Sequence, residues 1–129
     1  MLIHFEVPVL NKANGIRYSQ SSRVRTMPVD ILETSGSTVI FAELPGTQKD
    51  QVQLTFEEGI LTIGADRTNE DQSGKRYVLR ENTSTRRERR IVIDHEVDAS
   101  KIAASLSDGL LRVELPKAEK ALPRTIEVR

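Results

Sequence analysis

The sequence contains no cysteine and no tryptophan, and aromatic residues make up only 4% of its 129 residues. Without cysteine the chain can form neither a disulfide framework nor a thiolate metal site. The scarcity of aromatic side chains predicts an aliphatic core and argues against a surface on which nucleic-acid bases stack. Neither charge is in excess, because 19 lysine and arginine residues balance 19 aspartate and glutamate residues. The chain as a whole therefore has no net field that would attract nucleic acid or an anionic membrane.

Long hydrophobic runs are also missing. The chain begins MLIHFEVPVLNKANG, in which no basic region precedes the apolar residues and Glu6 and Pro8 interrupt them. This segment is too short to span a bilayer and lacks the layout of a secretion signal. We expect a cytoplasmic protein with no membrane span, and the chain length predicts one domain with short arms.

Short apolar runs with a period of two residues dominate from Pro28 onward. In order they are VDIL, TVIFAEL, QVQLTF, GILTIGA, RYVL, RRIVI, KIAASL and LLRVEL. In QVQLTF, for example, Val52, Leu54 and Phe56 share one face, which is typical of a strand with one buried and one wet side. No stretch of helical length carries a clean apolar stripe. About eight short strands at close spacing predict an all-β fold, a two-sheet antiparallel β-sandwich.

Glycine and proline separate these runs. LPG at 44–46 ends one strand, EEG at 57–59 precedes ILTI, and SDG at 107–109 precedes LLRV. Asp-Gly tolerates left-handed backbone and is a strong hairpin signal. The last two motifs are near copies of each other, so we expect two similar hairpins rather than a repeat architecture.

Three segments lie outside the predicted strands of the sandwich domain, which we place at residues 28–116. Residues 1–27 are polar after Leu10 and are expected to form a flexible N-terminal arm. Residues 66–76 form a long hydrophilic loop, and residues 117–129 form a C-terminal tail. A loop that long inside a compact domain usually has a function of its own.

The sequence carries no recognisable motif for catalysis or for nucleotide binding. Asp94, His95 and Glu96 cannot share a metal ion from a strand, because neighbouring side chains point to opposite faces. The basic run at 86–90 is interrupted by Glu88 and lacks aromatic residues, so it indicates the charged end of a strand rather than a nucleic-acid site. We expect no enzyme activity, no cofactor, no metal and no nucleic-acid partner.

Two stretches carry a family resemblance. MPVDILET with TVIFAELPGTQKDQVQLTFEEGILTIGADR, and VDASKIAASLSDGLLRVELPK, resemble the α-crystallin domain of small heat shock proteins. The most specific piece, residues 104–111, matches the family pattern of alanine, three variable residues, asparagine or aspartate, glycine, an aliphatic residue and leucine. AELPG and the terminal Ile-x-Val add to the match, which covers residues 28–129. The chain departs from the family pattern at Arg87 and Asp94, where phenylalanine and proline are usual.

The resemblance implies an immunoglobulin-like β-sandwich and an ATP-independent holdase chaperone, which binds partly unfolded client proteins and prevents their aggregation. It also implies homodimers that assemble into larger oligomers. In members with a long loop, a strand from that loop pairs with the neighbouring subunit. The residues so implied in strand exchange are Val29, Ile31, Tyr77, Val78, Leu79 and Arg89.

Arg89 falls on the position of the family's characteristic arginine, which supports the dimer interface. It has the same parity as Ile91 and Ile93, so it should lean toward the covered face of its strand. A covered arginine is expected to need a carboxylate partner, and the sequence does not identify one.

Ile126 and Val128 are two apolar residues in a charged tail. In an extended segment they point the same way, so both can enter one groove. Their burial would contribute roughly 3–5 kcal/mol gross, at about 1.5–3 kcal/mol each, less the entropy of ordering the tail. Pro123 stiffens the approach. The resemblance implies that the pair anchors in a groove of another subunit, between strands that carry Val52, Leu54, Ile102, Ala104 and Leu106. A frayed tail is the alternative.

The N-terminal segment LIHFEVPVL places Ile3, Phe5, Val7 and Val9 on one apolar face. Such a face suits client capture or oligomer contacts, and a disordered end is the alternative. For the whole chain, the alternative to a holdase is a co-chaperone-like β-sandwich module that binds one folded partner. Such modules are usually monomeric and lack the terminal Ile-x-Val, so the size of the particle discriminates between the two functions.

Overall fold

The computed structural model describes residues 24–67, 73–82, 86–121 and 123–129. The strands in these residues are β1 (Val29–Glu33), β2 (Ser37–Glu43), β3 (Val52–Glu57), β4 (Ile60–Asp66), β5 (Arg86–Val92), β6 (Ala103–Ser107) and β7 (Leu110–Pro116). Three short 3-10 helices, η2 (Lys49–Gln51), η3 (Ala99–Lys101) and η4 (Glu119–Ala121), lie between or after them. The described part of the chain contains no α-helix.

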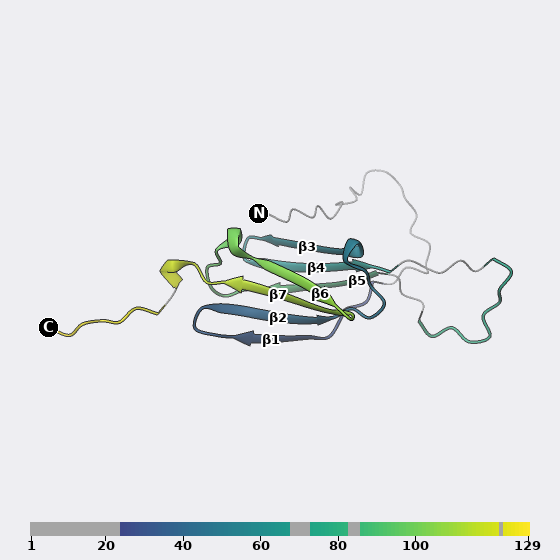
Figure 1. Ribbon diagram of the computed structural model, residues 1–129, viewed down its shortest axis with the longest axis horizontal. Coiled ribbons are helices and arrows are strands. Elements are labelled where there is room, and N and C mark those ends of the chain that lie inside the picture. The colour runs from purple at the N-terminus through teal and green to yellow at the C-terminus, as the bar shows by residue number, and fades with distance from the viewer. Residues whose placement is uncertain (1–23, 68–72, 83–85, 122) are drawn as a thin grey trace.

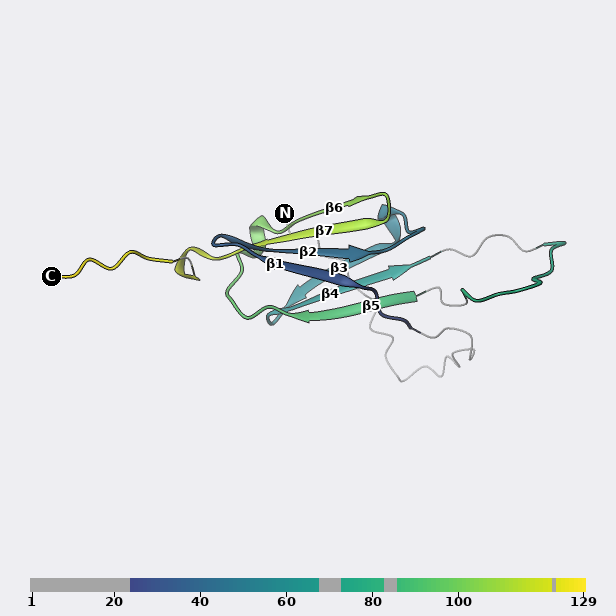
Figure 2. The same cartoon turned by 90° about the horizontal axis from the view of Figure 1, so that it is seen from below.

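Two antiparallel sheets pack face to face (Figures 1 and 2). One sheet has the strand order β1-β2-β7-β6, and the other has the order β3-β4-β5. The chain changes sheet after β2 and again after β5, so the larger sheet combines the first two and the last two strands, whereas the smaller sheet consists of three consecutive strands. The fold is the β-sandwich that the period-two pattern predicts, and this prediction is confirmed.

Alternation along the strands builds the core. Ile40 of β2 lies opposite Val113 of β7, and Leu54 of β3 lies opposite Ile63 of β4. These side chains are buried between the sheets, where each aliphatic residue contributes roughly 1.5–3 kcal/mol of burial free energy. Met27, just before β1, is also fully buried, which the strand pattern does not predict.

The two near-identical turn motifs form the same kind of hairpin. Glu58 and Gly59 join β3 to β4 with φ angles of 50° and 74°, and Asp108 and Gly109 join β6 to β7 with 50° and 76°. Two consecutive residues with positive φ make a type I′ turn, whose twist fits a two-residue hairpin. The expectation of two similar hairpins is therefore confirmed.

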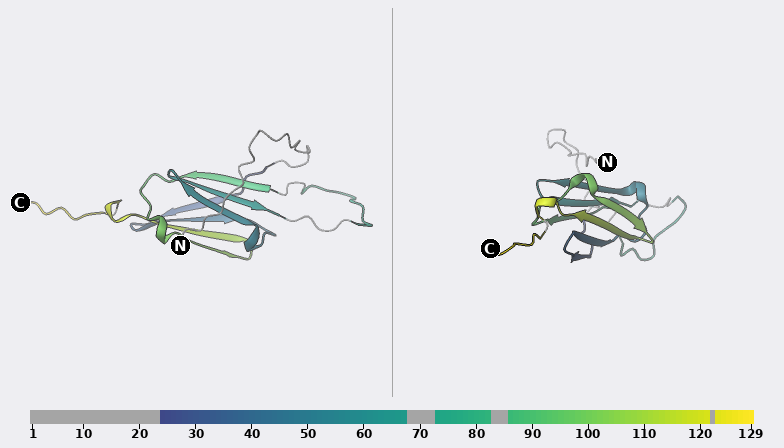
Figure 3. Two further views of the ribbon diagram at one scale, coloured as in Figure 1. Left: turned by 90° about the horizontal axis from the view of Figure 1, so that it is seen from above. Right: turned by 60° about the vertical axis from the view of Figure 1, so that its left-hand side comes forward.

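The sequence run RYVL is not a strand in this chain. Residues 73–82 contain no strand, and the next strand described after β4 is β5. These residues lie beyond one end of the sandwich, whereas the C-terminal tail leaves from the other end (Figures 1 and 3). A strand needs a neighbour to satisfy its backbone, and this segment has none within the described residues. Within the described residues, seven of the eight predicted runs are therefore strands and RYVL is not.

Candidate functional site

The free edge of β1 is the first candidate assembly surface. The carbonyl of Pro28 accepts a hydrogen bond from the N–H of Glu43, and the N–H of Thr34 donates one to the carbonyl of Ser37. The backbone N–H and C=O groups of the even-numbered residues of β1 therefore point toward β2. Because bonding alternates along an antiparallel pair, the backbone N–H and C=O groups of residues 29, 31 and 33 point away from the sheet. β1 has one neighbour among the described strands. Its outer edge is therefore open to a further strand.

Side chains along this edge are also uncovered. Val29 packs against the core, but Ile31 on the same face is 51% exposed. Leu32 on the opposite face is exposed as well. An added strand would pair with the open backbone groups and cover part of both side chains.

The segment predicted to supply that strand extends into solvent. Tyr77, Val78 and Leu79 are all exposed, and Val78 is 93% exposed. The guanidinium of Arg80 lies 4.6 Å from the centroid of the Tyr77 ring, a cation–π contact. The fold does not bring this segment beside β1 of its own chain (Figure 2). Pairing of the two across a dimer stays a prediction.

The opposite side of the sandwich presents the edge strands β3 and β6, one from each sheet. Among the residues predicted to accept the tail, Val52 and Leu54 of β3 are buried. Ile102, just before β6, and Ala104 and Leu106 within it are half-buried and pack against the core. The structure thus brings both halves of the predicted site to one side of the molecule, as Figure 1 shows.

Phe56 adds to this surface and was not predicted as part of it. It is half-buried against the core and shares the face of Val52 and Leu54. The period-two spacing of the strand could have identified it, since residues 52, 54 and 56 point the same way.

The tail residues themselves lie in water. Ile126 is 85% exposed and Val128 is 92% exposed. Residues 123–129 form neither helix nor strand. The tail of this chain does not cover its own β3 and β6 edges (Figure 1), so its docking on another subunit stays a prediction. Ile3, Phe5, Val7 and Val9 lie outside the described residues.

Arg89 faces the core side of β5, as its parity predicts, opposite Ile63 of β4. Its partner is not the expected carboxylate. The Arg89 Nη1 atom donates a hydrogen bond of 3.0 Å to the backbone carbonyl of Met27. The segment just before β1 is also joined to β5 by backbone hydrogen bonds between Arg25 and residues 86 and 88. A carbonyl oxygen partly satisfies a guanidinium without a second buried charge, so Arg89 connects the start of β1 to the smaller sheet.

The outer face of the smaller sheet carries a charged cluster. Arg86 makes ion pairs of 2.8 Å with Asp66 and 3.1 Å with Glu88. Burial lowers the pKa of the Arg86 guanidinium, but hydrogen bonds and charges from Asp66 and Glu88 outweigh this and raise that pKa. Gly64 leaves room for the cluster, because a Cβ there would lie 3.3 Å from Arg86 Nη2. These contacts show that Arg86, the first residue of the basic run, pairs with carboxylates of the smaller sheet itself.

Within the described ranges, no group of three or more histidine, aspartate or glutamate residues is arranged to hold a metal ion. None of the helices described is long and apolar enough to cross a membrane. The features that stand out are instead open strand edges and exposed aliphatic side chains.

Comparison with known proteins agrees with this geometry. A model of the Hsp20/alpha crystallin family matches residues 30–129. The chain belongs to this family. Its members are chaperones, and the resemblance seen in the sequence is confirmed.

Individual relatives of this small heat shock protein come from distant organisms. It is 35% identical over 106 residues to 18 kDa antigen 2 of Mycobacterium avium, covering 82% of this chain and 76% of that protein. It is 40% identical over 92 residues to heat shock protein HSP.16.4 of Streptococcus thermophilus, covering 68% of this chain and 63% of the relative. The chain thus spans just under two thirds of the length of the second relative.

Solved structures of similar proteins share the fold of this small heat shock protein. Heat shock protein 16.0 of Schizosaccharomyces pombe is 31% identical with a TM-score of 0.67, covering 81% of this chain and 98% of that one. A small heat shock protein of Xylella fastidiosa, described as having a distinct high order structure, is 31% identical with a TM-score of 0.64, covering 81% of this chain and 96% of that one. These two neighbours show that the chain has the fold of solved small heat shock proteins.

Proposed function

We propose that the protein is an ATP-independent holdase, which binds partly unfolded proteins and prevents their aggregation under stress. The observation that carries this proposal is the exposure of large aliphatic side chains on open edges of a well-packed sandwich. Ile31 and Leu32 on β1, Val78 and Leu79 in the loop, and the tail pair are all exposed. Soluble monomers rarely leave such surfaces uncovered unless another chain covers them.

Assembly covers these surfaces in the resting state. The loop residues Tyr77, Val78 and Leu79 of one subunit pair with β1 of its partner, which forms a homodimer. The Ile126 and Val128 pair of each tail docks between β3 and β6 of a subunit in another dimer, which links dimers into a larger oligomer. Both contacts are of modest strength, because each buries few side chains and orders a segment that is exposed in the free chain.

Stress shifts this equilibrium toward open states. When tails and arms detach, the β3 and β6 edges and the apolar face of Ile3, Phe5, Val7 and Val9 become available to exposed segments of client proteins. No step consumes a nucleotide, since client binding requires only the exposure of apolar surface.

The proposal is tested by the aggregation of a heat-labile enzyme, followed by light scattering. We expect the protein, at equimolar subunits and without nucleotide, to suppress the rise in scattering, and added ATP to leave the suppression unchanged. An unrelated stable β-sandwich protein at the same concentration is the control. Unchanged aggregation would exclude a holdase, and a monomeric mass would then favour the co-chaperone-like module.

A further inference from the structure

The residues at which the C-terminal tail begins are hydrogen-bonded on two sides. The backbone N–H of Lys117 donates to the carbonyl of Gly36 at 2.9 Å, which extends the β2–β7 ladder one step past the end of β7. On the other side, Ala118 donates to the carbonyl of Glu96 at 2.9 Å, and Asp98 donates to that of Pro116 at 2.9 Å. The backbone of residues 116–118, which we call the tail root, is therefore held between the β1–β2 turn and the segment after β5.

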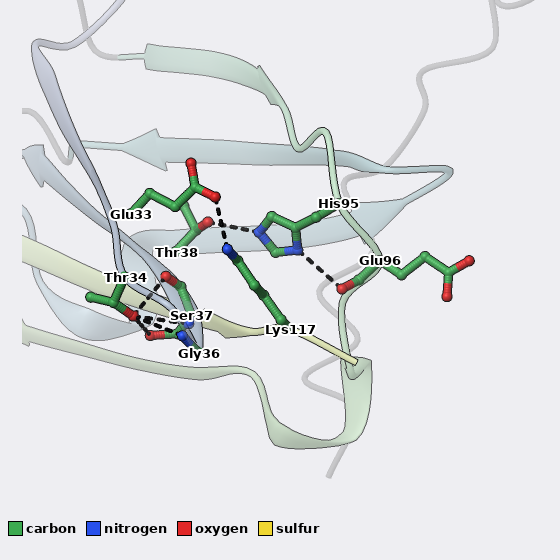
Figure 4. Close-up of polar contacts among 8 residues, drawn as sticks. All are labelled: Glu33, Thr34, Gly36, Ser37, Thr38, His95, Glu96 and Lys117. Atoms are coloured by element: carbon green, nitrogen blue, oxygen red, sulfur yellow. Dashed lines mark hydrogen bonds and ion pairs between the residues drawn. The ribbon is translucent and has the colours of Figure 1, made fainter. Parts of the chain in front are cut away.

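An ion pair made by a largely covered lysine side chain reinforces the first side. Lys117 Nζ lies 2.8 Å from Glu33 Oε1, and its side chain is only 12% exposed. The hydrogen bond and positive charge of Lys117 lower the pKa of the Glu33 carboxyl. Glu33 is the last residue of β1. The ion pair thus joins the tail root to the end of the strand that has the open edge (Figure 4).

Glu96 reinforces the second side through both its side chain and its backbone. Its carboxylate pairs with Lys120 Nζ at 2.6 Å. Its carbonyl accepts the hydrogen bond from Ala118 and lies 3.0 Å from His95 Nδ1. A carbonyl only accepts, so His95 Nδ1 is the donor. Lys117 and Lys120 are therefore held by carboxylates on two different segments of the sandwich.

His95 connects this second side to the interior of the larger sheet. Its Nε2 atom forms a hydrogen bond of 2.7 Å with the hydroxyl of Thr38. Thr38 belongs to β2 and is buried. The segment that holds Lys120 is thereby itself fastened to β2, as Figure 4 shows.

We infer that Lys117 and Lys120 are positioning residues that fix the direction in which the tail leaves the sandwich, and so restrict the subunit numbers at which the oligomer closes. The inference rests on the proposed docking of the tail on a neighbouring dimer. A closed assembly requires a defined angle between linked subunits. A tail with a loose root reaches neighbours at many angles, and assemblies of several sizes then have similar free energies.

The first test compares the wild type with the double variant Lys117→Met and Lys120→Met. Methionine keeps the apolar stem of each lysine, and the carboxylates left behind stay hydrated because the side chains of Glu33 and Glu96 are 61% and 58% exposed. We expect native mass spectrometry to show a wider range of subunit numbers, with the unfolding midpoint of the sandwich close to that of the wild type. Lys101→Met is the matched control, since Lys101 pairs with Asp98 at 3.6 Å and lies outside the tail root. The charge swap Glu33→Lys with Lys117→Glu restores an ion pair at this position. It should therefore give a narrower range of subunit numbers than Lys117→Glu alone.

A second measurement reports the tail direction without assembly. The native chain contains no cysteine, so Ser107→Cys and Arg124→Cys can be spin-labelled specifically. Both are placed in a chain that also carries Ile126→Ser and Val128→Ser, which removes docking. We expect the distance distribution between the labels to widen by roughly twofold or more when Lys117 and Lys120 become methionine, as for a segment that changes from semi-rigid to flexible.

The outcomes separate the inference from the proposed function. Unchanged subunit numbers and an unchanged distance distribution in the double methionine variant would overturn the inference, while suppression of client aggregation would still support the holdase. A wild type that forms nothing larger than a dimer would overturn it as well. Failure to suppress aggregation, together with widened distributions, would overturn the holdase and leave the positioning role of the two lysines supported.

Discussion

At the scale of single residues, Gly109 shows how closely backbone geometry and packing are linked. Its φ of +76° lies in the left-handed region, which side chains with a Cβ rarely adopt. Its carbonyl accepts a hydrogen bond of 2.7 Å from Leu44, and an added Cβ would lie 3.0 Å from Pro45 Cα. The SDG and LPG motifs, far apart in the sequence, therefore meet in one contact.

Replacing Gly109 with alanine should destabilise the sandwich. The left-handed conformation costs roughly 1–2 kcal/mol for a residue with a Cβ, and the contact with Pro45 adds to this, so we expect a loss of about 2 kcal/mol or more. The free energy of unfolding from urea denaturation measures it. Gly36→Ala is the control, because a Cβ added at Gly36 would meet nothing within 4 Å and the φ of this residue is not positive. Equal effects of the two substitutions would contradict this explanation.

Arg89 is a residue for which the sequence predicted the direction of the side chain but not its partner. Parity along β5 predicts correctly that the side chain turns toward the core face. The nature of its partner depends on the path of residues 25–27 past β5, which is a tertiary feature. The expected carboxylate is replaced by the carbonyl of Met27.

At the scale of elements, the hydrogen-bonding parity of β1 predicts which backbone groups a partner strand would use. The backbone hydrogen bonds of Pro28 and Thr34 show that the even-numbered residues pair with β2. The N–H of Leu32 therefore points toward β2, whereas the N–H of Ile31 points away from the sheet at the open edge. Edge strands tolerate proline only where the N–H is not needed by the sheet.

Ile31→Pro should therefore block dimer formation and leave the sandwich folded. The substitution removes an N–H that only a partner strand would use, and a ring in its place obstructs the edge. In a chain that also carries Ile126→Ser and Val128→Ser, so that no tail links subunits, we expect the mass measured by light scattering to fall from that of a dimer to that of a monomer, with a β-sheet circular dichroism spectrum. Ile31→Thr, which keeps the N–H and the branched shape, is the control and should still dimerise. Leu32→Pro should unfold the β1–β2 pair. Dimers that persist in Ile31→Pro would show that β1 is not the dimer edge.

The alternation of apolar and polar residues made most strands predictable from the sequence. Seven of the runs with alternating apolar residues are strands in the structure. RYVL carries similar residues, yet it is not a strand, because a strand exists only when another strand satisfies its backbone. Local composition does not contain that information.

At the scale of the whole molecule, the tail and the loop leave from opposite ends of the sandwich (Figure 3). The two proposed contacts, strand exchange and tail docking, therefore use separate surfaces. A subunit can make both at once, and loss of one should leave the other intact.

The variant Ile126→Ser with Val128→Ser should test the second contact alone. It removes about 1.5–3 kcal/mol of burial free energy per side chain from each docked tail. We expect the particle mass, from size-exclusion chromatography with light scattering, to fall toward that of dimers while the unfolding midpoint stays unchanged. Glu127→Ser is the matched control, because residue 127 points away from the other two in an extended tail. An unchanged mass in the double variant would show that the tail does not link dimers.

The sequence by itself determined the class of fold, the alternation that builds the core, the two hairpins and the family. These follow from local rules, since side-chain parity and positive φ at Asp-Gly are set by a few neighbouring residues. Only the tertiary structure decided that the β3 and β6 edges lie on one side, that Arg89 binds a carbonyl, and that Lys117 and Lys120 meet Glu33 and Glu96. Those contacts join residues from different sheets or distant turns, and their distances depend on how the two sheets pack rather than on any local pattern.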